Sequence, residues 1–333
     1  MAPDREPLLR IEGLRTSFHT HEGVVRAVDG VDLAVHEGEI LGVVGESGCG
    51  KTVTAMSILR LVDRPGRIEG GRIVFAGRDL LGLSASEMTA IRGEDIAMIF
   101  QQAKVSLNPV IPIGRQIAEQ FMRRRGLGQR AAMAEAVKLL AEVGIPAPES
   151  RIKAYPHELS GGQAQRVMIA IALALHPRLL IADEPTTAVD VTVQAQILRV
   201  LRERCRELGT ALILVTHDLG LVAQVADRVA VMYAGQVVEQ APVAELFAAP
   251  AHPYTRGLLR SLPRLGDVRA RLVEIPGTVP SLTRALPGCR FAARCDVRLA
   301  HRLDRCTEDA PLMMPLTAGK PHAVRCWFEG QLA

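Results

Sequence analysis

The chain has 333 residues, of which 48% are hydrophobic and 23% are charged, and its formal net charge is +4. This length and balance indicate a globular protein with one large domain and an appendage, or with two domains. The mild charge and the 3% aromatic content argue against a nucleic-acid-binding surface, and the one compact basic run, Arg123 to Arg125, is typical of a solvated helix end.

No apolar run approaches the roughly 18 residues that a membrane-spanning helix needs. The N-terminus, "MAPDREPLLR", carries charges without a following apolar core, so it is not a secretory signal. We therefore expect a cytosolic protein with reduced cysteines, and any membrane role would be peripheral.

Strand-like apolar runs alternate with helical patterns through most of the chain, which predicts an α/β core. The early runs 14–20 and 71–80 are expected to form a separate antiparallel layer. The later runs are short, apolar and bounded by glycine or charge, as buried parallel strands are; they cover residues 39–45, 179–183 and 211–218. Residues 229–240 predict a hairpin that turns near Ala234–Gly235.

The pattern turns helical between Ser106 and Leu175, which predicts an inserted helical subdomain at about 106–175. Within it, residues 131–145 form an amphipathic helix pattern that ends at Gly144. After about Ala249 proline becomes frequent, strand-like runs vanish and four of the six cysteines appear. We place a boundary near residue 260, between a domain of residues 1–260 and an extension of residues 261–333.

The segment "GESGCGKT" follows a predicted strand and precedes a predicted helix, which is the context that a phosphate-binding loop requires. Its glycines allow backbone N–H groups to surround an anion at a helix N-terminus. Lys51 supplies a point charge for the β- and γ-phosphates, Thr52 offers a hydroxyl to Mg²⁺, and Cys49 is expected to be only a small residue. The loop consists of Gly45, Glu46, Ser47, Gly48, Cys49, Gly50, Lys51 and Thr52.

The segment "LLIADE" ends an apolar strand with two acids, Asp183 and Glu184. A carboxylate at the end of such a strand can hold Mg²⁺ directly or through water. The metal does not need the second acid, so Glu184 is available to orient and polarise an attacking water. This pattern favours a hydrolase over a kinase, which would have to position an acceptor.

With these motifs the sequence resembles the ATP-binding-cassette (ABC) ATPases over roughly residues 8–259. The resemblance implies an ABC ATPase core with an antiparallel β layer and an inserted helical subdomain, plus a small cysteine-containing C-terminal extension. The family motifs, in order, are the phosphate loop, Gln101, the signature "LSGGQ" at Leu159–Gln163, Asp183 with Glu184, and His217.

The resemblance also implies that two nucleotide-binding subunits pack head to tail, so that the signature of one completes the phosphate site of the other. Ser160 can cap a helix that begins near Gln163, while Gly161 and Gly162 let the backbone approach a neighbour's γ-phosphate. The chain has one phosphate loop and one signature, so we expect it to need a second ATPase subunit.

Further roles follow from the resemblance alone. Gln101 would sense Mg²⁺ and the water, His217 would contact the γ-phosphate and hold Glu184, and Asp190 would communicate across the dimer. The family stacks an aromatic ring on adenine upstream of the loop. Phe18 is the nearby candidate, although it lies farther upstream than usual and equally suits a strand core.

Longer phrases, among them "YPHELSGGQAQRVMIAIALA" and "HPYTRGLL", are similar to the dipeptide/oligopeptide/nickel importer ATPases, and to the first of their two ATPase subunits. The resemblance implies a peripheral subunit on the cytoplasmic face of the cell membrane. It would pair with a homologous ATPase and dock on two permease subunits, which an extracytoplasmic solute-binding protein feeds. Dipeptides or oligopeptides are the expected cargo, with nickel, glutathione or another small solute as alternatives.

Residues 102–105 read "QAKV" where the family usually has Asp-Pro-x-Thr, which puts the partner interface and the substrate class in doubt. A soluble ABC ATPase acting on DNA or ribosomes would carry two cassettes or a long coiled-coil insertion. A non-hydrolysing partner cassette would not need both Glu184 and His217.

Four cysteines lie in the proline-rich tail, and this segment has little core of its own. Their spacing contains no closely paired cysteines of the kind that structural zinc sites favour, and two disulfides do not suit a reducing cytosol. Four thiolates can hold an iron–sulfur cluster, and related importer ATPases carry a similar tail, some with a [4Fe–4S] cluster. We expect a structural [4Fe–4S] cluster, with zinc or free thiols as alternatives, on Cys289, Cys295, Cys306 and Cys326.

Overall fold

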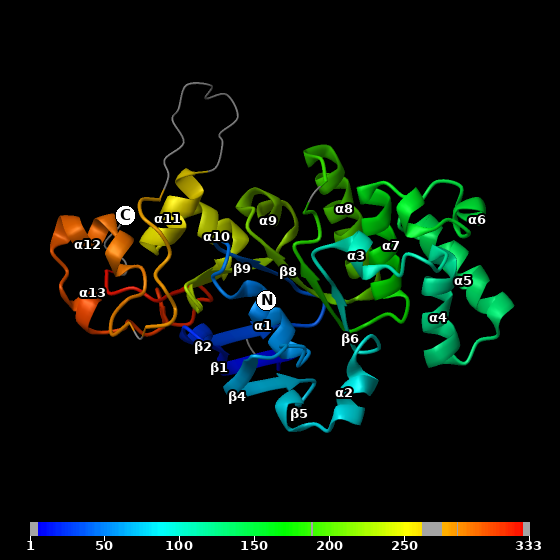
Figure 1. The fold of residues 1–333 in the computed structure, drawn as a ribbon. Coiled ribbons are helices and arrows are strands. Elements are labelled where there is room, and N and C mark those ends of the chain that lie inside the picture. Colours follow the sequence, from blue (N-terminus) through cyan, green and yellow to red (C-terminus); the bar gives the residue numbers. More distant parts are fainter. Residues whose placement is uncertain (1–5, 188, 262–274, 285, 329–333) are drawn as a thin grey trace. The chain divides into compact units, whose positions relative to one another are not determined.

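A computed structural model of the chain (Figure 1) describes residues 6–187, 189–261, 275–284 and 286–328. It divides into two compact units. The first unit contains residues 1–35, 41–82 and 216–333, and the second contains residues 36–40 and 83–215. The predicted boundaries at 106, 175 and 260 remain predictions, and residues 262–274, just after the last of these, lie outside the described residues.

An antiparallel sheet in the first unit has the strand order β2-β1-β4-β5. Leu9 pairs with Val35 on one side and with Phe75 on the other, and apolar residues such as Ile11 are buried along its length. The predicted antiparallel layer is therefore confirmed. The strands are β1 (Leu9–Thr20), β2 (Gly23–Val35), β4 (Gly66–Phe75) and β5 (Arg78–Asp79).

A second set of strands in this unit has the order β11-β12-β10-β9-β3. Strand β9 runs parallel to β3 and antiparallel to β10, with Ala234 and Gly235 at the turn in left-handed conformations. This turn geometry suits a two-residue hairpin and confirms the predicted one. The strands are β3 (Ile40–Val44), β9 (Arg228–Tyr233), β10 (Gln236–Pro242), β11 (Met314–Pro315) and β12 (Ala323–Val324).

The chain still forms strands beyond Ala249, where strand-like runs vanish from the sequence: β12 pairs with β10 through Glu239 and Val324. Two-residue strands are too short to leave a periodic pattern in the sequence. The buried Glu239 carboxylate reinforces this contact, since its Oε1 lies 2.8 Å from Nε2 of His322. The C-terminal segment thus extends the sheet of the first unit.

Short helices complete the first unit. Helix α9 packs on β3, where a Cβ on Gly42 would lie 2.4 Å from Cγ1 of Val222. The helices are α1 (Lys51–Ile58), α9 (Leu219–Val225), α10 (Val243–Ala248), α11 (Pro253–Arg260), α12 (Asp296–His301) and α13 (Arg305–Glu308), with 3-10 turns η1 (Leu80–Gly82) and η3 (Ala292–Arg294).

The second unit contains the parallel strands β6 (Ile96–Ile99), β7 (Leu179–Asp183) and β8 (Ala211–Thr216), in the order β8-β7-β6. Every residue of β7 is buried, as expected for a parallel strand that is covered on both faces. The predicted βαβ strands are therefore confirmed.

Helices occupy most of residues 106–175, as predicted. Helix α5 ends at Glu142, and Gly144 follows with φ +75°, where a Cβ would lie 2.6 Å from Nη1 of Arg166. The helices of the unit are α2 (Ala85–Ile91), α3 (Ala103–Ser106), α4 (Ile113–Arg125), α5 (Gln129–Glu142), α6 (Pro148–Arg151), α7 (Gly161–Leu173) and α8 (Val191–Leu208), with the 3-10 turn η2 (Pro156–Glu158).

The basic run closes α4, and Arg123 and Arg125 are exposed there, as predicted for a solvated helix end. Arg124 donates hydrogen bonds to the carbonyl oxygens of Thr89 and Arg92, and Arg125 donates one to that of Leu175. Arg123 also forms an exposed ion pair with Glu119. Among the described residues, none of the helices combines the length and apolar character that a bilayer crossing requires.

A first prediction concerns His252, the buried N-cap of α11, whose Nδ1 accepts a hydrogen bond from the N–H of Tyr254. Burial lowers its pKa from 6.5 to about 4. The unfolded chain therefore binds more protons than the folded chain between these values, and stability falls as the pH falls through this window. His252→Asn keeps an N-cap acceptor without the titration.

We expect the natural chain to lose on the order of 2 kcal/mol more stability than His252→Asn between pH 6.5 and pH 4. Urea unfolding at several pH values measures the difference. The exposed His21 gives a matched control, because His21→Asn should follow the natural curve. Parallel pH profiles for the natural chain and His252→Asn would contradict the prediction.

Candidate functional site

The predicted phosphate loop connects β3 to α1 in the first unit. A Cβ on Gly45 would lie 2.1 Å from the carbonyl oxygen of Met232, and a Cβ on Gly50, at φ +102°, would lie 2.3 Å from that of Ala27. Only glycine fits at these positions, because the loop backbone lies directly against neighbouring backbone. The loop is thereby shaped by the rest of the first unit.

Lys51 begins α1 and is buried. Its Nζ donates hydrogen bonds to the carbonyl oxygens of Gly45 and Glu46, at 2.7 and 3.0 Å. The ammonium therefore lies inside the curve of the loop, where a bound anion would meet it. Cys49 is also buried, and burial raises the pKa of its thiol, so that it remains protonated.

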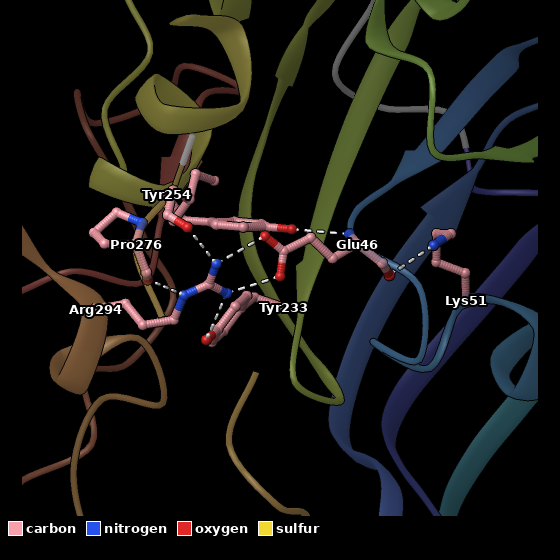
Figure 2. Close-up of polar contacts among 7 residues, drawn as sticks. Glu46, Lys51, Tyr233, Tyr254, Pro276 and Arg294 are labelled. Carbon is pink, nitrogen blue, oxygen red and sulfur yellow. Dashed lines mark hydrogen bonds and ion pairs between the residues drawn. The ribbon is translucent and has the colours of Figure 1, made fainter. Parts of the chain in front are cut away.

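Glu46 is held from a distant part of the chain, a feature that the sequence analysis missed (Figure 2). Both of its carboxylate oxygens accept hydrogen bonds from the guanidinium of Arg294, at 2.8 and 3.1 Å. Its backbone N–H donates to the hydroxyl of Tyr254, at 2.9 Å. Burial disfavours the charged guanidinium, but hydrogen bonds to Glu46 and Tyr233 outweigh this effect and raise the pKa of Arg294 above its ordinary value.

The two predicted acids lie at the end of β7 in the second unit, and Asp183 is buried. Glu184 follows at φ +46°, a left-handed conformation that is rare outside glycine and common at functional sites. Nε2 of Gln101 donates to its Oε2 at 2.6 Å, and the hydroxyl of Thr187 donates to the same oxygen at 3.0 Å. The structure thus brings the predicted Gln101 and Glu184 together.

The signature segment opens α7. The hydroxyl of Ser160 accepts from the N–H of Gln163 at 3.2 Å, and the side chain of Gln163 accepts in return from the N–H of Ser160 at 3.1 Å. This reciprocal cap makes Gly161 the first helical residue, so the expected helix start near Gln163 is corrected. Gly161 is exposed, whereas a Cβ on Gly162 would lie 2.6 Å from Cγ1 of Val193.

The remaining predicted residues are distributed over both units. Thr52 is exposed at the start of α1, and His217 follows β8 in the first unit. Asp190 is the exposed N-cap of α8 in the second unit. Phe18 is half-buried on β1, paired with Gly66 of β4, where a Cβ would lie 2.7 Å from its ring. The stacking role of Phe18 remains a prediction.

The four tail cysteines are free thiols in the first unit. Burial raises the pKa of the Cys326 thiol to about 12. Within the described part of the chain, however, no three histidine, cysteine, aspartate or glutamate residues are grouped so that they could hold a metal ion. The structure therefore does not support the predicted [4Fe–4S] cluster. Cys205 lies apart in α8, where burial raises its pKa to about 12.

Comparison with known proteins places these features in a family. Residues 28–187 match the ABC transporter family, and residues 238–301 match the C-terminal region of oligopeptide/dipeptide transporters. The chain is 50% identical to a probable peptide ABC transporter ATP-binding protein of Sinorhizobium fredii, over 99% of this chain and 97% of the relative. It is 47% identical to the dipeptide transport ATP-binding protein DppD of Bacillus subtilis, over 98% and 96% of the two chains.

Solved structures agree with these matches. The ATP-binding cassette MJ0796, in a dimeric post-hydrolysis state bound to ADP and Pi, has a TM-score of 0.64 and 26% identity, over 71% of this chain and 98% of that chain. CbiO1 of Clostridium perfringens, part of an ABC transporter complex, has a TM-score of 0.63 and 27% identity, over 74% and 92%. The fold, the phosphate loop and the C-terminal match lead to one conclusion: the chain belongs to the ATP-binding proteins of the peptide-transporting ABC family.

Proposed function

We propose that this protein is the ATP-hydrolysing subunit of an ABC importer that takes up dipeptides or oligopeptides. The observation that carries the proposal is the match to peptide ABC transporter ATP-binding proteins along nearly the whole chain, including the C-terminal region. Nickel, glutathione or another small solute is the alternative cargo. A soluble ATPase acting on nucleic acid or ribosomes is disfavoured, because these relatives are named as transport proteins.

ATP phosphates would lie in the loop Gly45–Thr52. Its backbone N–H groups and the dipole of α1 attract the anion, and the buried Lys51 supplies a full positive charge. The hydroxyl of Thr52 and the carboxylate of Asp183 have the oxygen chemistry that Mg²⁺ prefers, and Gln101 is proposed to sense the ion. The ion would neutralise charge on the β- and γ-phosphates.

Glu184 is the proposed base that orients the attacking water. Its carboxylate is held by Gln101 and Thr187, so its orientation is set before any substrate arrives. His217 is proposed to contact the γ-phosphate from the end of β8. Asp190 is proposed to act in communication with the second subunit, and Phe18 in adenine stacking.

Glu184→Gln tests the role of the carboxylate. We expect ATP turnover to fall on the order of 10³-fold, since the amide cannot accept the proton of the water, while ATP binding is retained. Glu203→Gln, an exposed acid on α8 that pairs only weakly with Arg199 at 4.0 Å, is a matched control that should keep full turnover. Unchanged turnover in Glu184→Gln would remove Glu184 from this role.

A second ATPase subunit is part of the proposal. Gly161 is exposed at the N-terminus of α7, whose N–H groups and dipole can act on a phosphate held by another chain. The related cassette MJ0796 was solved as a dimer. We propose that the partner here is a homologous ATPase, which gives a heterodimer.

Gly161→Trp separates a role between chains from a role within one chain. Because Gly161 is exposed, the variant should fold and bind ATP as the natural chain does, yet turnover of the detergent-purified importer should fall on the order of 100-fold. Gly128→Trp is the matched control, at an exposed helix N-cap with nothing within 4 Å of its Cβ position. Full turnover by Gly161→Trp, or by a strict monomer, would contradict the proposal.

The membrane partners are proposed to be two permease subunits, served by an extracytoplasmic solute-binding protein, with this chain peripheral on the cytoplasmic face. Val105 in α3 and Val110 just after it are each 77% exposed. Exposed apolar side chains this close together are typical of a protein interface. Val105 belongs to the segment 102–105, where the sequence departs from the usual family pattern, and Val110 follows that segment.

We also propose that the four tail cysteines ligate a [4Fe–4S] cluster, with zinc or free thiols as the alternatives. Support comes from two backbone N–H groups, those of Arg298 and Phe328, which donate to the sulfurs of Cys295 and Cys326. Hydrogen bonds to cysteine sulfur are one of the means by which proteins tune such clusters.

Anaerobic purification tests the cluster directly. We expect iron and acid-labile sulfide in equal amounts in the natural chain, their loss in Cys306→Ser, and their retention in Cys205→Ser, which alters a buried thiol in the other unit. Zinc without sulfide would favour the zinc alternative. A purified chain without bound metal would show that the four cysteines are free thiols.

A further inference from the structure

Arg294 uses its complete hydrogen-bonding capacity around the phosphate loop (Figure 2). A guanidinium has five N–H donors, and each of them has an acceptor here. Nε donates to the carbonyl of Pro276, Nη1 to Glu46 and to the hydroxyl of Tyr233, and Nη2 to Glu46 and to the carbonyl of Ile275. The side chain has one orientation that satisfies all five contacts, so its charge is fixed in place.

The ion pair with Glu46 is largely removed from water. The side chain of Arg294 is 7% exposed and that of Glu46 is 26% exposed. Charges in such surroundings are screened far less than surface charges, so their effects reach neighbouring groups. The pair is also bidentate, the geometry in which arginine binds a carboxylate best.

The negative charge of Glu46 is unfavourable in a loop that binds anions. It follows Gly45 directly, and its own carbonyl accepts a hydrogen bond from Lys51, the proposed phosphate-binding cation. An unpaired carboxylate at this position would repel the ATP phosphates and compete for the charge of Lys51. The paired carboxylate is neutralised, and it is turned toward Arg294 rather than toward the curve of the loop (Figure 2).

The backbone of Glu46 is held from the same side. Its N–H donates to the hydroxyl of Tyr254, and the Tyr254 ring packs against those of Tyr233 and Phe291, with ring centroids 4.6 and 5.5 Å apart. Tyr254 lies in α11 and Arg294 in η3, both in the C-terminal part of the first unit. The second residue of the loop is therefore held through both its backbone and its side chain.

We propose that Arg294 is a positioning residue for ATP binding, which neutralises and orients Glu46 so that the phosphate loop can accept the triphosphate. This proposal rests on the proposed binding of ATP phosphates by residues 45–52. The alternative is that Arg294 only holds the C-terminal segment together, through its contacts with Ile275 and Pro276. The two explanations differ in what should happen when the charge of Glu46 is also removed.

The experiment compares ATP dissociation constants of the full-length protein. Arg294→Gln leaves the Glu46 charge uncompensated, and we expect its ATP dissociation constant to rise on the order of tenfold at low salt. The increase should shrink as the ionic strength rises, because it is electrostatic. Arg294→Lys retains a charge without the bidentate geometry, so its constant should lie between those of the natural chain and Arg294→Gln.

The double variant Glu46→Gln/Arg294→Gln provides the decisive comparison. It has neither charge, so ATP binding should recover most of the affinity that Arg294→Gln loses. Arg305→Gln removes an exposed arginine from α13 in the same segment and serves as the matched control, with unchanged ATP affinity. Circular dichroism melts of every variant establish that the fold is retained.

The outcomes separate the explanations. Failure of the double variant to bind better than Arg294→Gln would overturn the proposal in favour of the purely structural role. If Arg294→Gln does not fold, the test uses Arg294→Lys and Glu46→Gln instead. The proposal would be overturned if ATP binding by these two variants showed the same salt dependence as ATP binding by the natural chain. Lys51→Ala tests separately whether residues 45–52 bind the ATP phosphates. Unchanged ATP binding in that variant would mean that the loop does not hold the phosphates.

Discussion

The close approach of the phosphate loop to its surroundings constrains the whole first unit. At Gly45 and Gly50 the loop backbone contacts the carbonyl oxygens of Met232 and Ala27, with no space for a side chain. Met232 belongs to β9 and Ala27 to β2, so one loop contacts both sets of strands in this unit. The loop can therefore take its shape only when β3 has paired with β9 and the β9–β10 hairpin has formed.

The functional groups of the second unit are positioned in another way, by hydrogen bonds between side chains and from side chains to the backbone. Glu184 has a left-handed backbone just beyond β7, and Gln101 and Thr187 fix its carboxylate. The signature segment uses a reciprocal cap between Ser160 and Gln163 to present Gly161 at a helix start. Both arrangements place polar groups precisely without burying charge, which suits groups that must meet a ligand.

Features encoded locally could be predicted from the sequence. The strand–loop–helix context of residues 45–52, the turn at Ala234–Gly235 and the acids ending β7 each depend on a few consecutive residues. The pairing of β12 with β10 and the contact of Arg294 with Glu46 could not be predicted, because nothing in a short segment specifies a distant partner. Helix α7 begins at Gly161, earlier than the start near Gln163 that the sequence predicted. The reason is local, because the reciprocal cap allows Gly161 to be helical despite its low helix propensity.

The distance along the chain between Glu46 and Arg294 has a consequence for how the protein is made. The two residues are 248 positions apart, so during translation the loop emerges long before its counterion. Until η3 is synthesised, the nascent chain carries a carboxylate beside Lys51 without its guanidinium partner. With the proposed role of Arg294, tight ATP binding would therefore have to wait until the C-terminal segment has been synthesised and has folded.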